Sequence, residues 1–223
     1  MTRRWHVLLV SALCLVTNIG RSTSAQDTST PLGGVVKDLG LKPGEVAVTL
    51  ATPLGDITIA VDAPHAPVTA ANFLKYVDGH FYDGGRFHRA TRPDNYTPAP
   101  PNRPAMEIIQ AGINPARRPE ALPAIPLERT SVTGLKHVAG TVSMARGTTA
   151  DTATSDFFIL LDDQPSLDFG GKRFDDEQGA AAFGRVVQGM DVVRRIQREP
   201  VQGQNLTPPI PIIKASRMVR PPG

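Results

Sequence analysis

Arg89 is the residue of this chain whose type and setting point most directly to chemistry. It follows Phe87 and His88 in the stretch GGRFHRATRP, residues 84–93. A guanidinium stays charged at physiological pH and presents a rigid fork of N–H donors, so it can bind and polarise a substrate. It cannot attack a substrate or shuttle protons at neutral pH. The chemistry open to Arg89 is therefore electrostatic.

Other familiar site types are incomplete in this sequence. Asp168–Gly170 spells the tripeptide of a kinase metal site, but no glycine-rich loop or His-Arg-Asp segment accompanies it. Ser143 lacks the flanking glycines of a hydrolase nucleophile. The acidic clusters Asp162–Asp163 and Asp175–Glu177 are more typical of solvated loops than of calcium sites. The histidines have no zinc-ligand spacing, and we interpret two of them as packed or surface residues. These two are His88 and His137.

Arginine, glutamine and apolar side chains remain, and one reaction needs no more than these. Rotation about an Xaa-Pro bond breaks amide resonance and no covalent bond, against a barrier of about 18–20 kcal/mol for a peptide bond. In the twisted transition state the proline nitrogen becomes pyramidal and regains its lone pair. A fixed guanidinium that donates to this nitrogen stabilises the transition state more than the planar ground state.

Periodicity predicts the elements that must position Arg89. Val46–Leu50 and Ile57–Val61 alternate on either side of a turn at Thr52–Asp56, which predicts a hairpin. Pro67–Val77 has helical spacing after a proline start, and Met190–Gln197 predicts a second helix.

The remaining apolar segments are strand-sized. Four of them are separated by loops rich in Gly and Pro: Phe87–Ala90, Met106–Gln110, Gly140–Ala145 and Asp156–Leu161. A last strand is predicted at Ile210–Met218, with its start confined by Pro209 and Pro211 to a sheet edge or a bulge. Many short strands with two helices favour a mainly β fold, a closed or nearly closed antiparallel barrel, over an alternating β-α-β sheet.

The N-terminal residues predict an export signal. Thr2–Arg4 provides a positive start, Trp5–Val16 is largely apolar, and Ser22–Ala25 supplies small residues for cleavage after Ala25. The apolar run is too short to predict a membrane span, so we expect no stable membrane insertion after cleavage and a periplasmic or secreted protein. Leu13 disfavours lipid attachment at Cys14, where a small residue would be expected to precede the cysteine.

The predicted organisation is therefore simple. Residues 1–25 form the signal peptide, 26–43 a flexible linker rich in Ser, Thr, Gly and Pro, 44–219 one folded domain and 220–223 a tail. Cleavage of the signal peptide removes three arginines and the one cysteine, but no acidic residue. Cleavage thus turns a formal charge of +3 into 21 basic against 21 acidic residues. A neutral chain gives no electrostatic argument for a nucleic-acid partner.

Five segments, in order, resemble the cyclophilin-type peptidyl-prolyl isomerases over about residues 44–218. They are Phe87–Arg89, Gln110–Gly112, Leu135–Ala145, Ser155–Ile159 and Phe183–Met190. The resemblance implies a closed eight-stranded antiparallel β-barrel capped by two α-helices, an active groove on its outer face and no cofactor.

The resemblance also implies roles for individual residues. Arg89 takes the catalytic position, and Gln110 holds the substrate backbone and the arginine. Phe158 forms the floor of a proline pocket that Ile108 and Leu167 complete. The remaining pair, Ala145 and Arg146, matches a backbone-contacting Ala-Asn pair. Because that contact is made mainly by main-chain atoms, we expect arginine to be tolerated at this position.

Three departures from the family pattern concern the proline pocket. Glu107 stands where a phenylalanine is usual, Ser166 where many members have tryptophan, and Ala180 where a histidine is common. Together they predict a shallower pocket, with about 1.5–3 kcal/mol of burial lost for each missing side chain. The proline-rich insertion 92–104 is expected to border the groove and to replace part of this wall.

Three hypotheses follow. The first is an exported prolyl isomerase that acts as a monomer on Xaa-Pro bonds of unfolded or partly folded proteins, and the second is a proline-peptide-binding chaperone with little catalysis. The third is an unrelated barrel that binds a small ligand, which would lack an external Arg89 groove. The sequence does not identify the client proteins, and no coiled-coil heptad argues for assembly.

Overall fold

The computed structural model describes residues 39–96 and 105–218. All of them belong to one compact unit, Gly34–Gly223. The predicted signal peptide, residues 26–38 of the predicted linker, residues 97–104 of the insertion and the predicted tail lie outside the described residues. The elements are β1 Val46–Thr52, β2 Gly55–Val61, α1 Pro67–Asp78, β3 Gly85–Thr91, β4 Ile108–Gly112, the 3-10 helix η1 Pro115–Glu120, α2 Thr130–Thr133, β5 Thr141–Met144, β6 Phe157–Leu160, the 3-10 helix η2 Pro165–Leu167, β7 Ala182–Gln188, α3 Met190–Arg198, β8 Val201–Gln202, β9 Asn205–Ile212 and β10 Lys214–Arg217.

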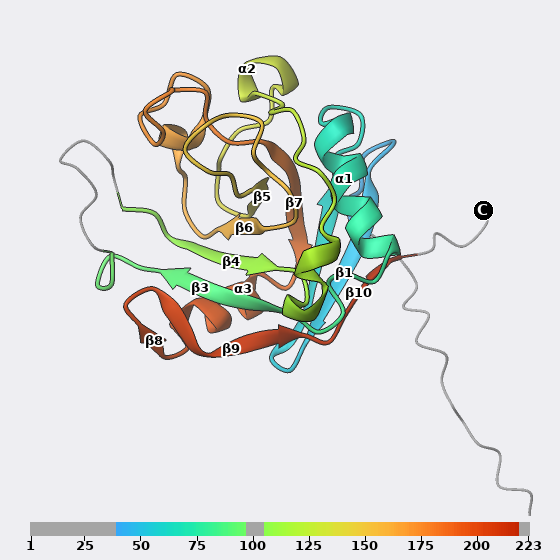
Figure 1. Ribbon diagram of the computed structural model, residues 1–223, viewed down its shortest axis with the longest axis vertical. Coiled ribbons are helices and arrows are strands. Elements are labelled where there is room, and N and C mark those ends of the chain that lie inside the picture. The colour runs from blue at the N-terminus through green and yellow to red at the C-terminus, as the bar shows by residue number, and fades with distance from the viewer. Residues whose placement is uncertain (1–38, 97–104, 219–223) are drawn as a thin grey trace, which may run out of the picture. The chain divides into compact units, whose positions relative to one another are not determined.

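The strands form one antiparallel sheet that closes on itself (Figure 1). Its order is β10-β1-β2-β7-β5-β6-β4-β3-β9-β8. Only Ile213 separates β9 from β10, so one bent strand pairs with β3 through its first part and with β1 through its second. Counting that strand once and leaving out the two-residue β8, eight strands complete the circuit. The predicted eight-stranded antiparallel barrel is confirmed.

The predicted first hairpin is confirmed residue by residue. β1 and β2 pair from Val46 opposite Val61 to Thr52 opposite Gly55. The hydroxyl of Thr52 donates to the carbonyl of Gly55 at 2.7 Å and accepts from the backbone N–H of Leu54 at 3.1 Å, which fixes the turn. One strand of this hairpin, β1, also pairs with β10, from Ala51 opposite Lys214 to Val48 opposite Arg217.

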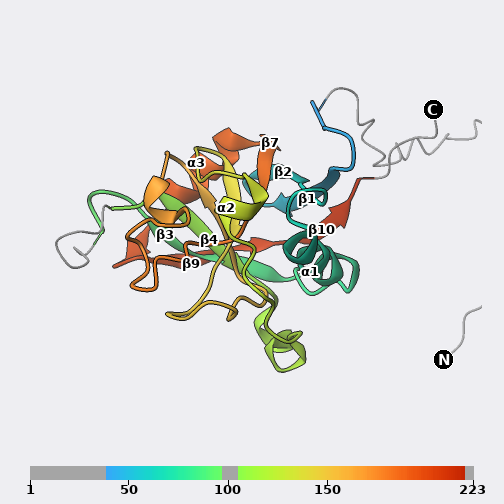
Figure 2. The same cartoon turned by 90° about the horizontal axis from the view of Figure 1, so that it is seen from above.

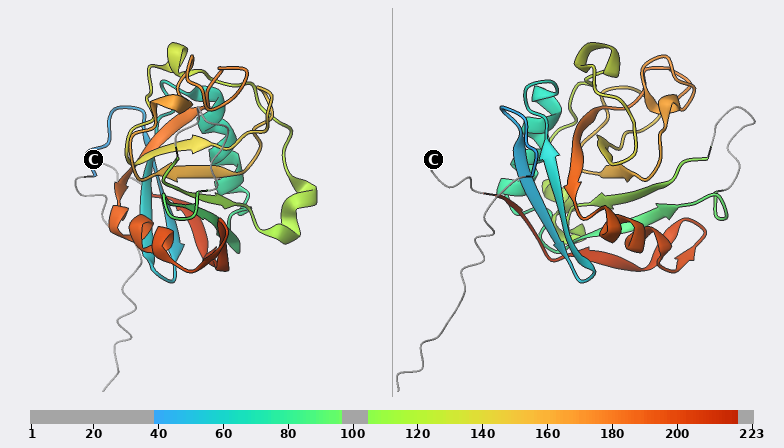
Figure 3. Two further views of the ribbon diagram at one scale, coloured as in Figure 1. Left: turned by 90° about the vertical axis from the view of Figure 1, so that its left-hand side faces the viewer. Right: turned by 180° about the vertical axis from the view of Figure 1, so that it is seen from behind.

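Both predicted helices are present, and they contact different strands (Figures 1 and 3). α1 begins with Pro67, whose missing N–H is not needed in a first turn. The next two N–H groups, of Val68 and Thr69, donate to the carboxylate of Glu128 at 3.0 and 2.7 Å. This carboxylate satisfies helix-end donors and anchors the loop before α2. The short η1 has no buried residue and lies on the outside of the domain (Figure 2).

An aromatic cluster joins α1 to the interior of the barrel. The ring of Phe73 lies 5.4 Å from Tyr82, 5.5 Å from Phe157 and 5.0 Å from Phe183, measured between centroids, and the contact with Phe157 is edge-to-face. All four side chains are fully buried. Because the interior is filled in this way, a ligand groove has to lie on the outer face of the sheet.

Candidate active site

Arg89 reaches the outer face because β3 contains an irregularity. The register of β3 against both β4 and β9 shifts between Phe87 and Arg89, which leaves His88 as the extra residue of a β-bulge. Phe87 and Ala90 both belong to the buried core, although regular alternation would place them on opposite faces. The bulge therefore turns the half-buried Arg89 away from the core.

Two glutamines hold the guanidinium of Arg89. Its Nη1 donates to Oε1 of Gln110, the partner residue on β4, at 3.2 Å. Its Nε and Nη2 both donate to Oε1 of Gln204, in the turn between β8 and β9, at 2.9 and 2.5 Å. The two amide oxygens fix the orientation of the guanidinium without neutralising its charge.

The surroundings of Arg89 destabilise its charged form and so lower its pKa. Burial lowers the pKa of Arg89, the nearby charge of Arg173 lowers it further, and Tyr96 opposes the effect. Arginine starts from a pKa so high that the group still stays protonated at neutral pH. The site thus presents a desolvated, permanent positive charge, which is the form in which a hydrogen-bond donor stabilises a developing lone pair most strongly.

A pocket of about 280 Å³ adjoins this guanidinium. Three lining residues, Met106, Ile108 and Gln110, alternate along one face of the chain that leads into and through β4. All seven predicted site residues line the pocket: Arg89, Ile108, Gln110, Ala145, Arg146, Phe158 and Leu167. The structure thus brings together the whole predicted set, and the role of each residue toward a substrate stays a prediction.

The prediction that Glu107 erodes the pocket is wrong. Met106 lines the pocket instead, and Oε2 of Glu107 accepts a hydrogen bond from Nε2 of Gln197 on α3 at 3.0 Å. Side chains along an extended segment alternate between its two faces, so Glu107 lies on the opposite side from Met106 and Ile108. The acid is thereby kept out of the apolar wall.

Comparison with known proteins agrees with this geometry. Residues 47–217 match the family described as "Cyclophilin type peptidyl-prolyl cis-trans isomerase/CLD". The chain belongs to the cyclophilin family. By that membership and by its relatives, this cyclophilin is a peptidyl-prolyl cis-trans isomerase.

Its relatives include two bacterial proteins of this activity. "Peptidyl-prolyl cis-trans isomerase A" of Dickeya dadantii (strain 3937) is 36% identical over 161 residues, which are 72% of this chain and 75% of the relative. "Peptidyl-prolyl cis-trans isomerase B" of Escherichia coli (strain K12) is 34% identical over 150 residues, 67% of this chain and 83% of the relative. A crystal structure of a Cryptosporidium parvum cyclophilin matches the fold with a TM-score of 0.61 at 20% identity, and covers 79% of this chain and 99% of that one.

Phe174 compensates for the small residues at the other two departures. Ser166 and Ala180 do not line the pocket, and Ala180 is buried in the same apolar cluster as Phe158 and Leu167. Phe174, from the loop between η2 and β7, lines the pocket and packs against this cluster. An aromatic wall is therefore present in this cyclophilin, but it comes from a part of the chain that the family pattern does not identify.

Arg146 holds the loop that carries Phe174. Its guanidinium lies 3.5 Å from the centroid of the Phe174 ring, and its side chain is 1% exposed. Its Nη2 donates to Oδ1 of Asp176 at 2.6 Å, and its Nε donates to the carbonyl of Gly179 at 2.7 Å. The hydrogen bond from Arg146 also lowers the pKa of Asp176. Arg146 is thus a buried, hydrogen-bonded part of the pocket wall.

His137, Asp168 and Ser143 are arranged as in a hydrolase triad, but His137 and Ser143 are buried. Nδ1 of His137 lies 2.8 Å from Oδ1 of Asp168, and Nε2 lies 3.0 Å from Oγ of Ser143. Ser143 is completely inaccessible, so its hydroxyl cannot meet a substrate. The His137 ring instead stacks on Phe158, with a centroid distance of 6.4 Å and an angle of 19°. Asp168 and Ser143 thus hold the His137 ring against the pocket residue Phe158.

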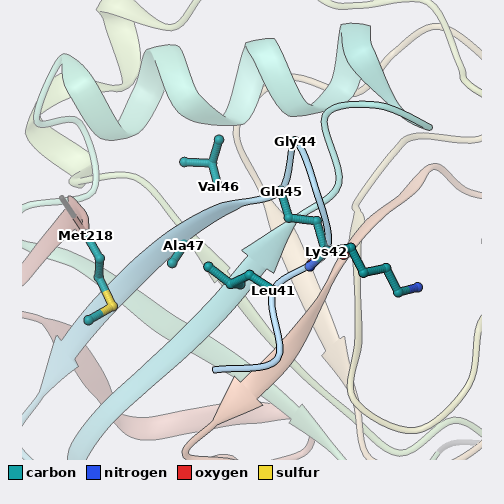
Figure 4. A pocket seen from close by; sticks show the side chains of 7 residues that line it. All are labelled: Leu41, Lys42, Gly44, Glu45, Val46, Ala47 and Met218. Atoms are coloured by element: carbon teal, nitrogen blue, oxygen red, sulfur yellow. The ribbon is translucent and has the colours of Figure 1, made fainter. Parts of the chain in front are cut away.

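Other pockets offer less chemistry. One of about 200 Å³ is lined by Leu41, Lys42, Gly44, Glu45, Val46, Ala47 and Met218 (Figure 4). Its carboxylate, Glu45, is already paired with Arg185 of β7 and accepts a hydrogen bond from the backbone N–H of Lys42 at 2.7 Å.

Among the described residues no three His, Cys, Asp or Glu side chains gather as a metal site. None of the described helices is both long and apolar enough to cross a membrane.

Four residues at the site were not found by reasoning from the sequence. Gln204 and Met106 lie next to predicted residues in space, and Arg173 and Phe174 come from a loop. The alternation Met106-Glu107-Ile108 would have identified Met106. The other three lie in loops or turns whose path no periodicity predicts.

Proposed function

We propose that this cyclophilin accelerates rotation about Xaa-Pro bonds in unfolded or partly folded client proteins outside the cytoplasm. The observation that supports this most is the guanidinium of Arg89, fixed by two neutral amides at the edge of an apolar pocket. The pocket receives the proline ring, and the guanidinium faces the proline nitrogen. Charge complementarity to the twisted state then lowers the rotational barrier.

The hydrogen bonds of Arg89 leave donors for this purpose. A guanidinium side chain has five N–H donors. The described contacts use three of them, one each on Nε, Nη1 and Nη2. One N–H on each terminal nitrogen remains to donate to the substrate. Each ~1.4 kcal/mol by which such a bond is stronger in the twisted state than in the planar state gives a tenfold rate increase.

The apolar side chains provide the binding energy. Met106, Ile108, Phe158 and Leu167 form one buried cluster on the outer face of the barrel. Burying the three methylene groups of a proline ring against them contributes about 2 kcal/mol. This is a weak interaction, as suits an enzyme that releases many different clients.

The test is NMR exchange spectroscopy on an Xaa-Pro peptide with the chain from Gln26 onward and its Arg89→Ala variant. We expect the parent to accelerate exchange and the variant to lose about ten- to one-hundredfold, because a charge-assisted hydrogen bond is worth about 1.5–3 kcal/mol. Arg89→Lys keeps the charge but loses the fork of donors, so it should recover only part of the rate.

Arg86→Ala is the matched control, since Arg86 lies on the same strand and is exposed. It should retain the parental rate. If the parent perturbs the peptide's chemical shifts without accelerating its exchange, the protein is a proline-binding module and the catalytic proposal fails.

Export is proposed from the pattern of residues 1–25. Its test is to produce the full chain in a bacterial host and to determine the N-terminus of the protein released by osmotic shock. A mature chain that starts at Gln26 supports the proposal. A chain that stays in the cytoplasm with residues 1–25 attached overturns it, without affecting the assignment of Arg89.

A further inference from the structure

The side chains that line the pocket carry charge of one sign only. Its lining includes three charged residues, and all are arginines: Arg89, Arg146 and Arg173. The nearest acid in sequence to the apolar wall, Glu107, is held on the other side of the strand by Gln197. A groove with low-dielectric walls and one sign of charge concentrates ligands of the opposite sign.

The three arginines differ in how their charges are balanced. Arg146 is paired with Asp176 at 2.6 Å. Arg89 has only the two neutral glutamines as side-chain partners among the described residues. Arg173 donates through Nη1 to the hydroxyl of Tyr96, and its guanidinium carbon lies 5.6 Å from the centroid of that ring. Within the described parts of the chain, no carboxylate lies within ion-pair distance of Arg173.

The acids nearest to Arg173 in sequence are already engaged. Asp176 binds Arg146 and Glu177 binds Lys172. Asp175 has an interaction of its own. Two guanidinium groups, those of Arg89 and Arg173, therefore share one pocket, and the charge of Arg173 is one of the causes that lower the pKa of Arg89. A ligand carboxylate would relieve this repulsion as well as form its own hydrogen bonds.

Arg173 is fixed at its base. Its backbone N–H donates to the carbonyl of Ser166 at 3.0 Å, next to the pocket residue Leu167. Its neighbour Phe174 is part of the pocket wall, and Tyr96 holds its guanidinium from the other side. A side chain that is tied at both ends loses little further entropy when it binds a ligand.

We propose that Arg173 is a specificity-determining residue that binds the side-chain carboxylate of an Asp or Glu adjacent to the substrate proline. This inference rests on the proposed function, because it takes the pocket to be the proline site. It predicts that this cyclophilin prefers acidic Xaa-Pro or Pro-Xaa segments over neutral ones of the same size.

The experiment compares peptides that differ only by Glu or Gln, placed once before and once after the proline. Catalysed exchange is measured by NMR for each, relative to the uncatalysed rate of the same peptide. At one of the two positions we expect kcat/KM to be about three- to tenfold higher for Glu, as for a partly exposed ion pair. Raising the salt concentration should shrink this ratio by screening.

Variants test whether the Glu-to-Gln ratio of kcat/KM depends on Arg173. Arg173→Gln should bring the Glu-to-Gln ratio to about one, and Arg173→Lys should retain part of it because the charge remains. Arg195→Gln is the control, since Arg195 is an exposed arginine on α3 paired with Asp191, and it should leave the ratio unchanged. Equal rates for Glu and Gln at both positions, or a ratio that survives in Arg173→Gln, would overturn the inference.

Peptide binding separates this inference from the proposed function. If no peptide is isomerised, the proposed function fails, but the dissociation constants of the same peptides, from NMR shift titrations, still give a Glu-to-Gln ratio. A preference for Glu that depends on Arg173 would then support the binding role alone. An absent preference would overturn it.

Discussion

At the scale of single residues, the choice of amides around Arg89 has a chemical reason. A carboxylate in place of Gln110 or Gln204 would form an ion pair and would compete with the substrate for the guanidinium donors. An amide oxygen accepts a hydrogen bond and leaves the positive charge uncompensated. Gln204 accepts two of the three hydrogen bonds that Arg89 donates to described residues, so we consider it a positioning residue.

Removing that amide should impair catalysis more than binding. In Gln204→Leu we expect kcat to fall about two- to tenfold with little change in KM, because a hydrogen bond worth about 0.5–1.5 kcal/mol no longer orients Arg89. Exchange spectroscopy over a range of peptide concentrations separates the two constants. Gln202→Leu, at an exposed position of the same hairpin, serves as the control. An unchanged kcat in Gln204→Leu would mean that Gln110 alone suffices to hold Arg89.

The site residues divide into those that the sequence identifies and those that it does not. Arg89, Gln110 and Phe158 lie in short segments with a recognisable pattern, and the structure brings them to one pocket. Gln204 is 115 positions from Arg89, and only the pairing of β9 with β3 brings them together. No local propensity encodes such a contact, since it depends on the closed sheet.

At the scale of elements, periodicity succeeds where side chains alternate regularly. The first hairpin and the two long helices were predicted from it. β7 was not predicted as a strand, and it contains Gly184, where a Cβ would lie 2.6 Å from the carbonyl oxygen of Ala60 on β2. The close approach of the two strands requires glycine, and glycine is also what weakens a strand pattern in the sequence.

The first part of β9 was not predicted as a strand because it contains prolines. Pro208, Pro209 and Pro211 lie within this strand, which begins five residues before the predicted start at Ile210. Proline is tolerated there because β9 pairs with β8 only at Asn205 and Leu206, while Ile210–Ile212 pair with β3 alone. The predicted location of Pro209 and Pro211 at an edge or bulge is confirmed.

The stability of the folded protein should depend on pH through Asp168. This residue follows η2 and bonds to His137, in the loop before β5. Asp168 accepts hydrogen bonds from the backbone N–H of His137 at 3.2 Å and lies 2.8 Å from its Nδ1. Burial opposes ionisation of this carboxyl, but the hydrogen bond and the nearby charge of His137 outweigh it, and the pKa of Asp168 is lowered. A carboxyl whose pKa is lower in the folded state adds stability above its unfolded pKa of about 3.9.

Asp168→Asn tests this linkage. We expect the variant to be less stable than the parent at pH 7. The difference should shrink as the pH falls below about 4, through the lowered folded-state pKa. Urea unfolding at a series of pH values measures it. A difference that stays constant from pH 7 to the acid limit would show that the charge of Asp168 contributes nothing.

At the scale of the whole molecule, α1 and the barrel share one core through Phe73. Phe73→Ala should destabilise the protein by about 3–5 kcal/mol, because it removes a ring that contacts three other buried aromatic side chains. Chemical denaturation checks the value. Val132→Ala is the control, since Val132 is 83% exposed, and it should change stability by less than about 0.5 kcal/mol. Similar losses for both variants would contradict the role of this core.

The closed barrel itself followed from the resemblance to a family more than from periodicity. Alternation shows that short strands are present, but it does not show which strands are neighbours. Neighbours such as β2 and β7 are far apart in sequence, and each pairing depends on the others being formed. The order of strands is therefore a property of the complete chain.

Closure by β10 also limits when the barrel can form. Val48 of β1 pairs with Arg217 of β10, so one edge of β1 stays unpaired until β10 has been synthesised. Until then the nascent chain carries an unpaired strand edge beside an unfinished core. The barrel of this cyclophilin thus closes only when β10, the last described strand, is available to pair with β1.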